Sequence, residues 1–345
     1  MNIALLGYTQ SGKKTLFELL TARQIPESAL HEGKALEGLA RVHDERLEHL
    51  NLMVSPEKMT SAETQVVSCP DITSGATDRQ WLDAAQRCDV LCLLIRAFDA
   101  DDVYHPLGSV DAARDRANLN AELILADLGL VETRIERLDK DRRRGLTSTQ
   151  EHEYAALLKC KDQLEQERYL SSLELEPHHS DALRSLGLLT RKPLLWAYNV
   201  AEDAVADDAP EPGAFVVSCL IEKEIAQIEE MDERRQFLED CGLSSTGGER
   251  LNAAAYSALG LISYYTQGPT EVRAWTVVKG TSAPAAAGKI HSDLERGFIR
   301  VEVITFDDFV ACGGESEAKA AGKMQLRGKD YTVEDGDVCL FRFNV

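Results

Sequence analysis

The sequence predicts an α/β fold in which a parallel sheet carries an inserted antiparallel helical hairpin and is followed by a small β-rich domain. Three observations predict it. Short apolar runs alternate with helical stretches, a near-heptad pattern fills residues 112–170, and residues 266–345 change to strands with Gly-rich turns. The length of 345 residues fits two or three domains.

The parallel sheet is predicted by five apolar runs with helical stretches between them. Strands buried on both faces are near-continuously apolar, and a helix must connect each parallel pair. The runs are Asn2–Leu6, Gln65–Val67, Val90–Ile95, Leu194–Tyr198 and Ala214–Cys219.

The hairpin is predicted by apolar residues that recur at near-heptad spacing in a heavily charged segment. They are Leu119, Leu123, Leu128, Val131, Ile135 and Leu138. The first helix should end near Lys140-Asp141-Arg142-Arg143-Arg144-Gly145, and a second helix should run from about Gln150 to Tyr169. A short helical region, Ser180 to Leu189, leads back to the sheet.

The C-terminal segment reads as three strands with one crossing helix. The strands are Val272–Val278, Phe298–Ile304 and Val338–Phe343, and the helix is Pro284–His291. The expected domains are therefore 1–111 with 190–265, the inserted hairpin 112–189, and a C-terminal domain 266–345.

Composition excludes several classes of protein. The 58 acidic and 38 basic residues give a net charge of −20, which argues against indiscriminate coating of nucleic acid. No apolar run reaches the length of a membrane span, and the N-terminus lacks the features of a signal peptide. The eight cysteines include no C-x-x-C pair, so we expect reduced thiols in a cytoplasmic protein.

A phosphate-binding loop follows the first strand: Gly7-Tyr8-Thr9-Gln10-Ser11-Gly12-Lys13-Lys14-Thr15. Two glycines and a lysine at this spacing, between a strand and a helix, are typical of a P-loop. The residue after the lysine is ordinarily Ser or Thr, whose hydroxyl binds Mg²⁺, but here it is Lys14. An ammonium group at that position would replace part of the metal's charge and none of its coordination geometry.

With this loop and the hairpin, the C-terminal segment makes the chain resemble the YchF/Obg-like ATPase family. The resemblance is most specific in Thr266–Thr276, Ala287–His291, Glu295–Arg300, Ala321–Met324, Gly328–Val338 and Phe343–Val345. It implies a P-loop NTPase G domain, a helical arm and a C-terminal TGS domain with a β-grasp (ubiquitin-like) fold. In this family the arm and the other domains line a cleft thought to meet ribosomal RNA.

The same resemblance implies a base-recognition element. The family carries N-x-x-E after a strand, and Asn199-Val200-Ala201-Glu202 matches it; members with this motif are associated with ATP at least as much as with GTP. Ser218-Cys219 looks like the loop that follows in the family. The nucleotide-binding candidates are therefore Gln10, Ser11, Gly12, Lys13, Lys14, Thr15, Asn199, Val200, Glu202, Ser218 and Cys219.

The metal-linked motifs depart from the family. Its D-x-x-G aligns with Ser68-Cys69-Pro70-Asp71, so Ser68 replaces the aspartate and Asp71 the glycine. No Thr occurs between Arg23 and Arg41, where the first switch normally offers a ligand for Mg²⁺. Because Mg²⁺ offsets charge on the transferred phosphoryl group, these changes predict binding of ATP or GTP with weakened or lost hydrolysis.

Two other functions stay open on the sequence alone. One is a nucleotide-free interaction scaffold that uses the arm and the TGS domain. The other is an active ATPase or GTPase in which Asp71 takes the metal role that Ser68 has lost, which would need a rearranged loop.

Three further segments have residue types that could bind RNA or a metal ion. The arm tip, Arg142, Arg143 and Arg144, is a candidate for ribosome or RNA contact, with a solvated helix end as the alternative. His178 and His179 are interpreted as a solvated turn after Pro177 without metal ligands, and Asp99–Asp102 as an acidic surface turn.

Overall fold

The computed structural model describes residues 1–26, 33–73, 75, 79–100, 102–142, 145–205, 209–228 and 230–344. Two compact units share these residues. The first contains Met1–Ala40 and Gln65–Leu251, and the second contains Arg41–Thr64 and Asn252–Val345.

The first unit is built on a six-stranded sheet of order β2-β4-β1-β5-β6-β7. β1 lies parallel to both β4 and β5, with Leu5 opposite Ser68 and Cys92, and β5, β6 and β7 continue the parallel arrangement. β1 and most of β5 are fully buried, as continuous apolar runs require. The strands are β1 (Asn2–Leu6), β2 (Leu36–Arg41), β4 (Glu63–Ser68), β5 (Val90–Ala97), β6 (Leu194–Val200) and β7 (Phe215–Val217).

Short helices connect or follow these strands. α1 starts directly after the glycine-rich loop, and it packs against α8, which follows β7. The helices are α1 (Lys13–Thr21), α4 (Leu82–Gln86), η4 (Glu202–Ala204), α8 (Cys219–Gln227), α9 (Met231–Asp240) and α10 (Gly247–Ala258).

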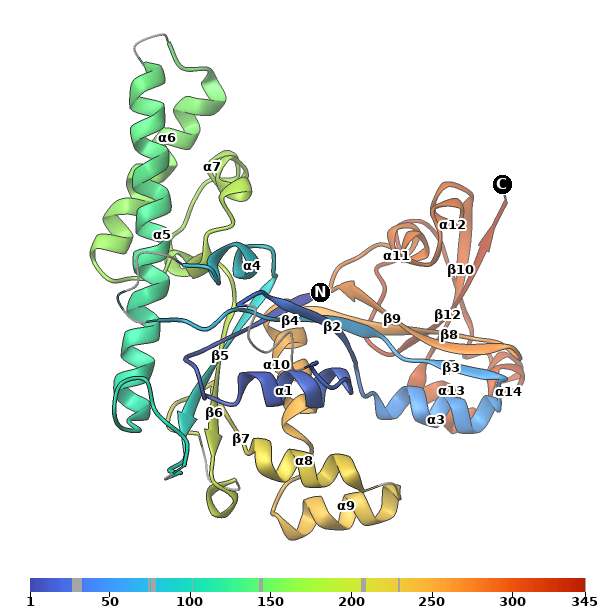
Figure 1. Ribbon diagram of the computed structural model, residues 1–345. Helices are drawn as coiled ribbons and strands as arrows, with labels where there is room; N and C mark the ends of the chain where they lie inside the picture. The colour runs from blue at the N-terminus through green and yellow to red at the C-terminus, as the bar shows by residue number, and fades with distance from the viewer. Residues whose placement is uncertain are drawn as a thin grey trace. The chain divides into compact units, whose positions relative to one another are not determined.

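The hairpin consists of α5 (Ala112–Arg142) and α6 (Ser148–Glu165), which lie antiparallel and are drawn in green in Figure 1. Leu138 of α5 and Leu157 of α6 belong to one buried apolar cluster. Arg134 makes two hydrogen bonds of 2.7 and 2.8 Å to the carboxylate of Glu153, which fixes the register of the two helices.

The hairpin is anchored where the chain returns to the sheet. The carboxylate of Asp127, fully buried in α5, accepts hydrogen bonds from the backbone N–H groups of Leu189 and Thr190 at 2.8 and 2.7 Å. The returning segment contains η1 (Leu170–Ser172), α7 (Pro177–Leu183), η2 (Arg184–Leu186) and η3 (Leu189–Arg191).

The interpretation of residues 177–179 as a turn is wrong. Pro177 occupies the first turn of α7, where its missing N–H is not needed and its fixed φ suits a helix. His179 N–H donates to the Glu176 carbonyl at 3.0 Å, closing this turn.

The second unit is built on a mixed sheet of order β11-β10-β12-β8-β9-β3. α11 packs on β9 and β10 and fills an apolar cluster with Ala283, Ala286 and Ala287. The strands are β3 (Lys58–Thr60), β8 (Leu261–Gln267), β9 (Glu271–Val278), β10 (Phe298–Thr305), β11 (Gln325–Arg327) and β12 (Asp337–Phe343); the helices are α3 (Glu45–Val54), α11 (Ala283–Ile290), α12 (Ser292–Arg296), α13 (Phe306–Cys312) and α14 (Glu315–Ala320).

The segment Arg41–Thr64 belongs to this second unit, although it joins β2 to β4 of the first sheet in sequence. β3 pairs in parallel with β9, and Tyr265 donates a hydrogen bond of 2.5 Å to Asp44. The units thus divide the chain differently from the domain boundaries expected from sequence, which remain a prediction.

The predicted fold class is confirmed: a parallel sheet, a helical hairpin and a C-terminal mixed sheet are all present. Four strands, β2, β3, β8 and β11, were not predicted from the sequence. All eight cysteines are free thiols. Within the described residues, no helix combines the length and apolar character that a membrane span needs.

Candidate functional site

The glycine-rich loop joins β1 to α1 with three residues at positive φ. Gly7 has φ 153°, Gln10 has φ 60° and Gly12 has φ 96°. A Cβ atom on Gly12 would lie 2.2 Å from Nδ2 of Asn199 and 3.2 Å from Sγ of Cys219. Glycine is therefore required at position 12 by both backbone conformation and space.

Asn199, at the end of β6, braces this loop. Its Nδ2 donates to the carbonyl of Ser11 at 3.0 Å, and its Oδ1 accepts from the backbone N–H of Cys219 at 3.0 Å. The side chain is 3 % exposed. Asn199 thus ties the loop to the start of α8.

Cys219 contributes to the same brace. Burial raises the pKa of its thiol to about 12, so the S–H stays protonated at neutral pH. The thiol lies 3.7 Å from the carbonyl oxygen of Gly12, where it serves as a weak donor.

Lys13 forms an ion pair with Asp71, which follows β4. The lysine side chain is 3 % exposed, whereas that of Asp71 is 36 % exposed. Burial lowers the pKa of Lys13 below its ordinary value, and the carboxylate of Asp71 opposes this shift. The lysine of the loop therefore already holds an anionic oxygen.

Two cavities open at the loop. The smaller, about 160 Å³, is lined by Tyr8 to Thr15 and Asp71. The larger, about 700 Å³, has the volume of a small-molecule site. It is lined by Gln10, Gly12, Thr15, Phe98, Asp99, Ala100, Val103, Asn199, Val200, Ala201, Glu202, Asp203, Cys219, Leu220 and Lys223.

One wall of the larger cavity was interpreted from sequence as a mere surface turn. Arg96, buried at the end of β5, donates to the carbonyls of Phe98 and Val103 at 3.1 and 3.0 Å and fixes this wall. Asp99 is exposed, as expected of a surface turn, and it lines the cavity together with Ala100, a role that was not predicted. A buried arginine after an apolar strand was the signal available in the sequence.

The residues around the loop do not fit a Mg²⁺ site of the usual P-loop kind. Lys14 stands where a hydroxyl ligand is expected, and Ser68 is 3 % exposed at the end of β4. Among the described residues, Asp71 is the one carboxylate lining the smaller cavity, and Lys13 already neutralises it. The other lining side chains that carry oxygen atoms are uncharged: Tyr8, Thr9, Gln10, Ser11 and Thr15.

Two buried hydroxyl groups near the loop lack a hydrogen-bond partner within the described part of the chain. They belong to Ser11 and Ser218, which are 2 % and 1 % exposed. Buried polar groups in folded proteins are nearly always paired. Ser11 also lines the smaller cavity, so a ligand in that cavity would have a hydroxyl to bond.

The other sequence candidates fall partly outside the described residues. Arg143 and Arg144 of the arm tip lie there, as does Asp101 of the acidic turn. Arg142 is described: its guanidinium lies 5.4 Å from the ring centroid of Tyr154, across the hairpin. This contact packs the end of α5 on α6.

Comparisons with known proteins agree along the whole chain. Residues 261–344 match the family YchF-GTPase_C, described as a protein of unknown function (DUF933). The chain is 38 % identical to the "Ribosome-binding ATPase YchF" of Bacillus subtilis over 100 % of both chains. It is 34 % identical to "Obg-like ATPase 1" of Xenopus laevis, covering 100 % of this chain and 92 % of that one.

A solved structure agrees with the fold. The Schizosaccharomyces pombe YchF GTPase superposes with a TM-score of 0.81 at 26 % identity, covering 99 % of this chain and 97 % of that one. The chain therefore belongs to the YchF/Obg-like ATPase family.

Proposed function

We propose that this chain binds ATP or GTP at the loop Gly7–Thr15 and acts at the ribosome with weakened hydrolysis. The observation that carries the proposal is the pairing of buried Lys13 with an anionic oxygen inside the loop cavity. A phosphate oxygen of a nucleotide would replace the carboxylate oxygen of Asp71. The names of two relatives, a ribosome-binding ATPase and a GTPase, support nucleotide binding and ribosome association.

The proposed site divides into two parts. Gln10, Ser11, Gly12, Lys13, Lys14 and Thr15 would cradle the phosphates, because their loop joins a strand to a helix N-terminus. Asn199, Val200 and Glu202 would face the base in the larger cavity, beside Ser218 and Cys219. Asn199 and Cys219 would also hold the loop to the start of α8.

Weakened hydrolysis follows from the metal-linked positions. Lys14 would place a positive charge near the phosphates and stand in for part of the charge of Mg²⁺. A cation of this kind provides none of the octahedral oxygen geometry with which Mg²⁺ orients a transferring phosphoryl group. This chain is therefore expected to bind nucleotide but to hydrolyse it slowly.

Ribosome association is proposed for the arm and the C-terminal domain. α5 spans 31 residues and ends at Arg142, and the sequence continues with Arg143 and Arg144. A local basic group can steer binding to RNA although the whole chain is acidic. This partner would place the protein in the cytoplasm.

Calorimetric titration with ATP and with GTP, first with Mg²⁺ and then with EDTA, tests the nucleotide part. We expect binding that survives EDTA, since Lys14 supplies a built-in charge. Binding that requires Mg²⁺ would contradict the role of Lys14 and favour an active enzyme with a rearranged metal site. No binding of either nucleotide would favour the nucleotide-free scaffold.

Cosedimentation with ribosomes tests the second part. Replacing Arg142, Arg143 and Arg144 together by Ala should weaken cosedimentation and reduce its salt dependence. Arg184→Ala, which removes an exposed arginine elsewhere in the same insertion, is the control. Equal cosedimentation of the two variants would remove the arm tip from the proposal.

A further inference from the structure

Three histidines gather in the helical arm, far from the loop in sequence. His178 and His179 lie at the start of α7, and their ring centroids are 4.2 Å apart. His152 of α6 lies beside them, with its ring centroid 4.5 Å from that of His178 and 6.0 Å from that of His179. Nothing in the proposed nucleotide or ribosome function uses these side chains.

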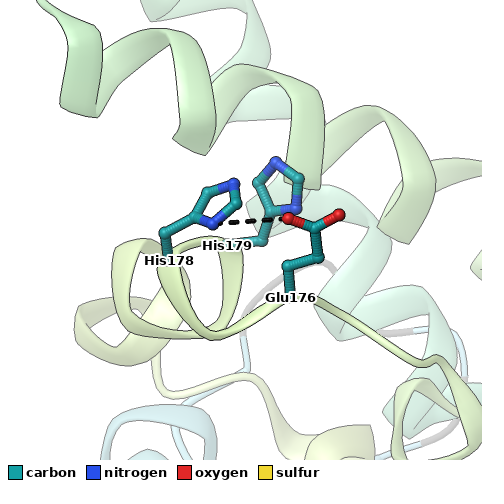
Figure 2. Close-up of side chains that lie close together, drawn as sticks. All are labelled: Glu176, His178 and His179. Carbon is teal, nitrogen blue, oxygen red and sulfur yellow. Dashed lines mark ion pairs between the residues drawn. The ribbon is translucent and has the colours of Figure 1, made fainter.

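A carboxylate completes the group. Glu176 precedes α7, and its Oε2 lies 3.5 Å from Nδ1 of His178. Figure 2 shows this carboxylate directed toward the two imidazole rings. One ligand atom from each of Glu176, His178 and His179 lies within 4.8 Å of the others, the one such group among the residues that the structure describes.

His179 provides an independent sign that a ligand is missing. The residue is 9 % exposed, and its Nδ1 is buried without a hydrogen-bond partner in the described part of the chain. Buried imidazole nitrogens are ordinarily hydrogen-bonded or bound to metal. Glu176 and His178 are exposed on the solvent side of the same group, which leaves a path for an ion.

The spacing suits a small ion with nitrogen and oxygen ligands. Zn²⁺ binds His nitrogen and carboxylate oxygen at about 2.0–2.2 Å in a tetrahedron, so its ligand atoms lie about 3.4 Å apart. Rotation of the exposed Glu176 and His178 side chains covers the difference from 4.8 Å. An imidazole-rich set without thiolate favours Zn²⁺ over the hard ions Mg²⁺ and Ca²⁺.

We propose that Glu176, His178 and His179 form a Zn²⁺ site that His152 closes from α6. Such an ion would link α7 to the second helix of the hairpin. The site lies apart from the loop Gly7–Thr15, and the proposal does not depend on nucleotide binding.

The test is calorimetric titration of the chelator-treated, nucleotide-free full chain with ZnCl₂. We expect saturable one-to-one binding, and a melting temperature that rises with Zn²⁺. Loss of a residue that only supports a metal ligand lowers metal affinity roughly 10–100-fold. Loss of a ligand itself should lower the affinity for Zn²⁺ by at least as much. His178→Ala, His179→Ala and Glu176→Gln should each show this loss.

His291→Ala is the matched control, because His291 lies the same 3.5 Å from a carboxylate, that of Asp293, and is exposed. Its affinity for Zn²⁺ should be unchanged. Since His179 is buried, circular dichroism checks the folding of His179→Ala, and the exposed His178 and Glu176 variants carry the test if that variant unfolds. Unchanged affinity in both exposed variants would overturn the site.

Co²⁺ substitution gives a second readout. Tetrahedral nitrogen and oxygen ligands should give visible d–d bands without a thiolate charge-transfer band. A thiolate band would overturn the proposal, because it would place the ion on one of the eight cysteines. Unchanged Zn²⁺ affinity in His152→Ala would refute the link to α6.

Discussion

Replacing Asp71 by Asn should strengthen nucleotide binding. In the ligand-free chain, the Asp71 carboxylate forms an ion pair with Lys13, the residue that would bind phosphate oxygens. A nucleotide must displace this carboxylate and then bind beside it. Asn keeps the size and hydrogen-bonding capacity of the side chain and removes the negative charge.

The size of the effect follows from charge and exposure. Two unit charges about 5 Å apart interact by about 3 kcal/mol at an effective dielectric constant of about 20. Asp71 is 36 % exposed, so solvent screens part of this repulsion and the carboxylate can turn outward. We therefore expect a gain of about 1–2 kcal/mol, which is about 5- to 30-fold in the dissociation constant.

Calorimetry with ATP and GTP at fixed ionic strength measures this change. Asp83→Asn is the control, because it removes the same charge from an exposed position on α4. Weaker binding by Asp71→Asn in the presence of Mg²⁺ would refute the reasoning. It would mean that Asp71 holds the metal, as the hypothesis of a rearranged active site requires.

Three other variants test separate parts of the structure. Lys13→Ala should abolish nucleotide binding in the same titration, and unchanged affinity would remove the loop from the proposal. Asn199→Ala leaves two buried backbone groups unpaired, so denaturant unfolding should show a loss of about 2–4 kcal/mol. Hydrogen bonds from Arg342 hold the pKa of Glu302 below its ordinary value. The pair therefore stabilises the fold above the unfolded-state pKa of the glutamate, and this stability is lost as the pH falls through the lowered folded-state pKa. Glu302→Gln should therefore destabilise the chain by roughly 1 kcal/mol at pH 7 and lower its melting temperature. The loss is this small because Arg342 is half exposed. The difference from the parent chain should vanish in acid.

The sequence predicted those parts of the fold whose signal is local. β1 and β5 are continuous apolar runs, and α5 carries a regular apolar repeat. β3 was missed because it has three residues, none of them buried, and its place depends on pairing with β9 more than two hundred residues later. Short edge strands bury too little apolar surface to leave a periodic pattern.

Site residues with a local sequence pattern were predicted, and those that meet only through tertiary contacts were not. The spacing of Gly7, Gly12 and Lys13 is local, so the loop could be found. The pairing of Lys13 with Asp71 joins residues 58 positions apart and has no local pattern. His178 and His179 were not predicted as metal ligands because Pro177 was interpreted as the mark of a solvated turn. Tertiary packing, which has no local pattern, brings His152 beside them.

The loop and its metal ligands depend on different parts of the chain. The loop is shaped by the backbone of Gly12 and by the two hydrogen bonds of Asn199, all of which are present. The metal-linked positions Lys14 and Ser68 take no part in those hydrogen bonds, so they can change while the loop keeps its conformation. Selection on binding alone would preserve the first set and leave the second free to vary. A chain that has kept the two hydrogen bonds of Asn199 and lost the metal ligands is therefore expected to bind nucleotide without fast turnover.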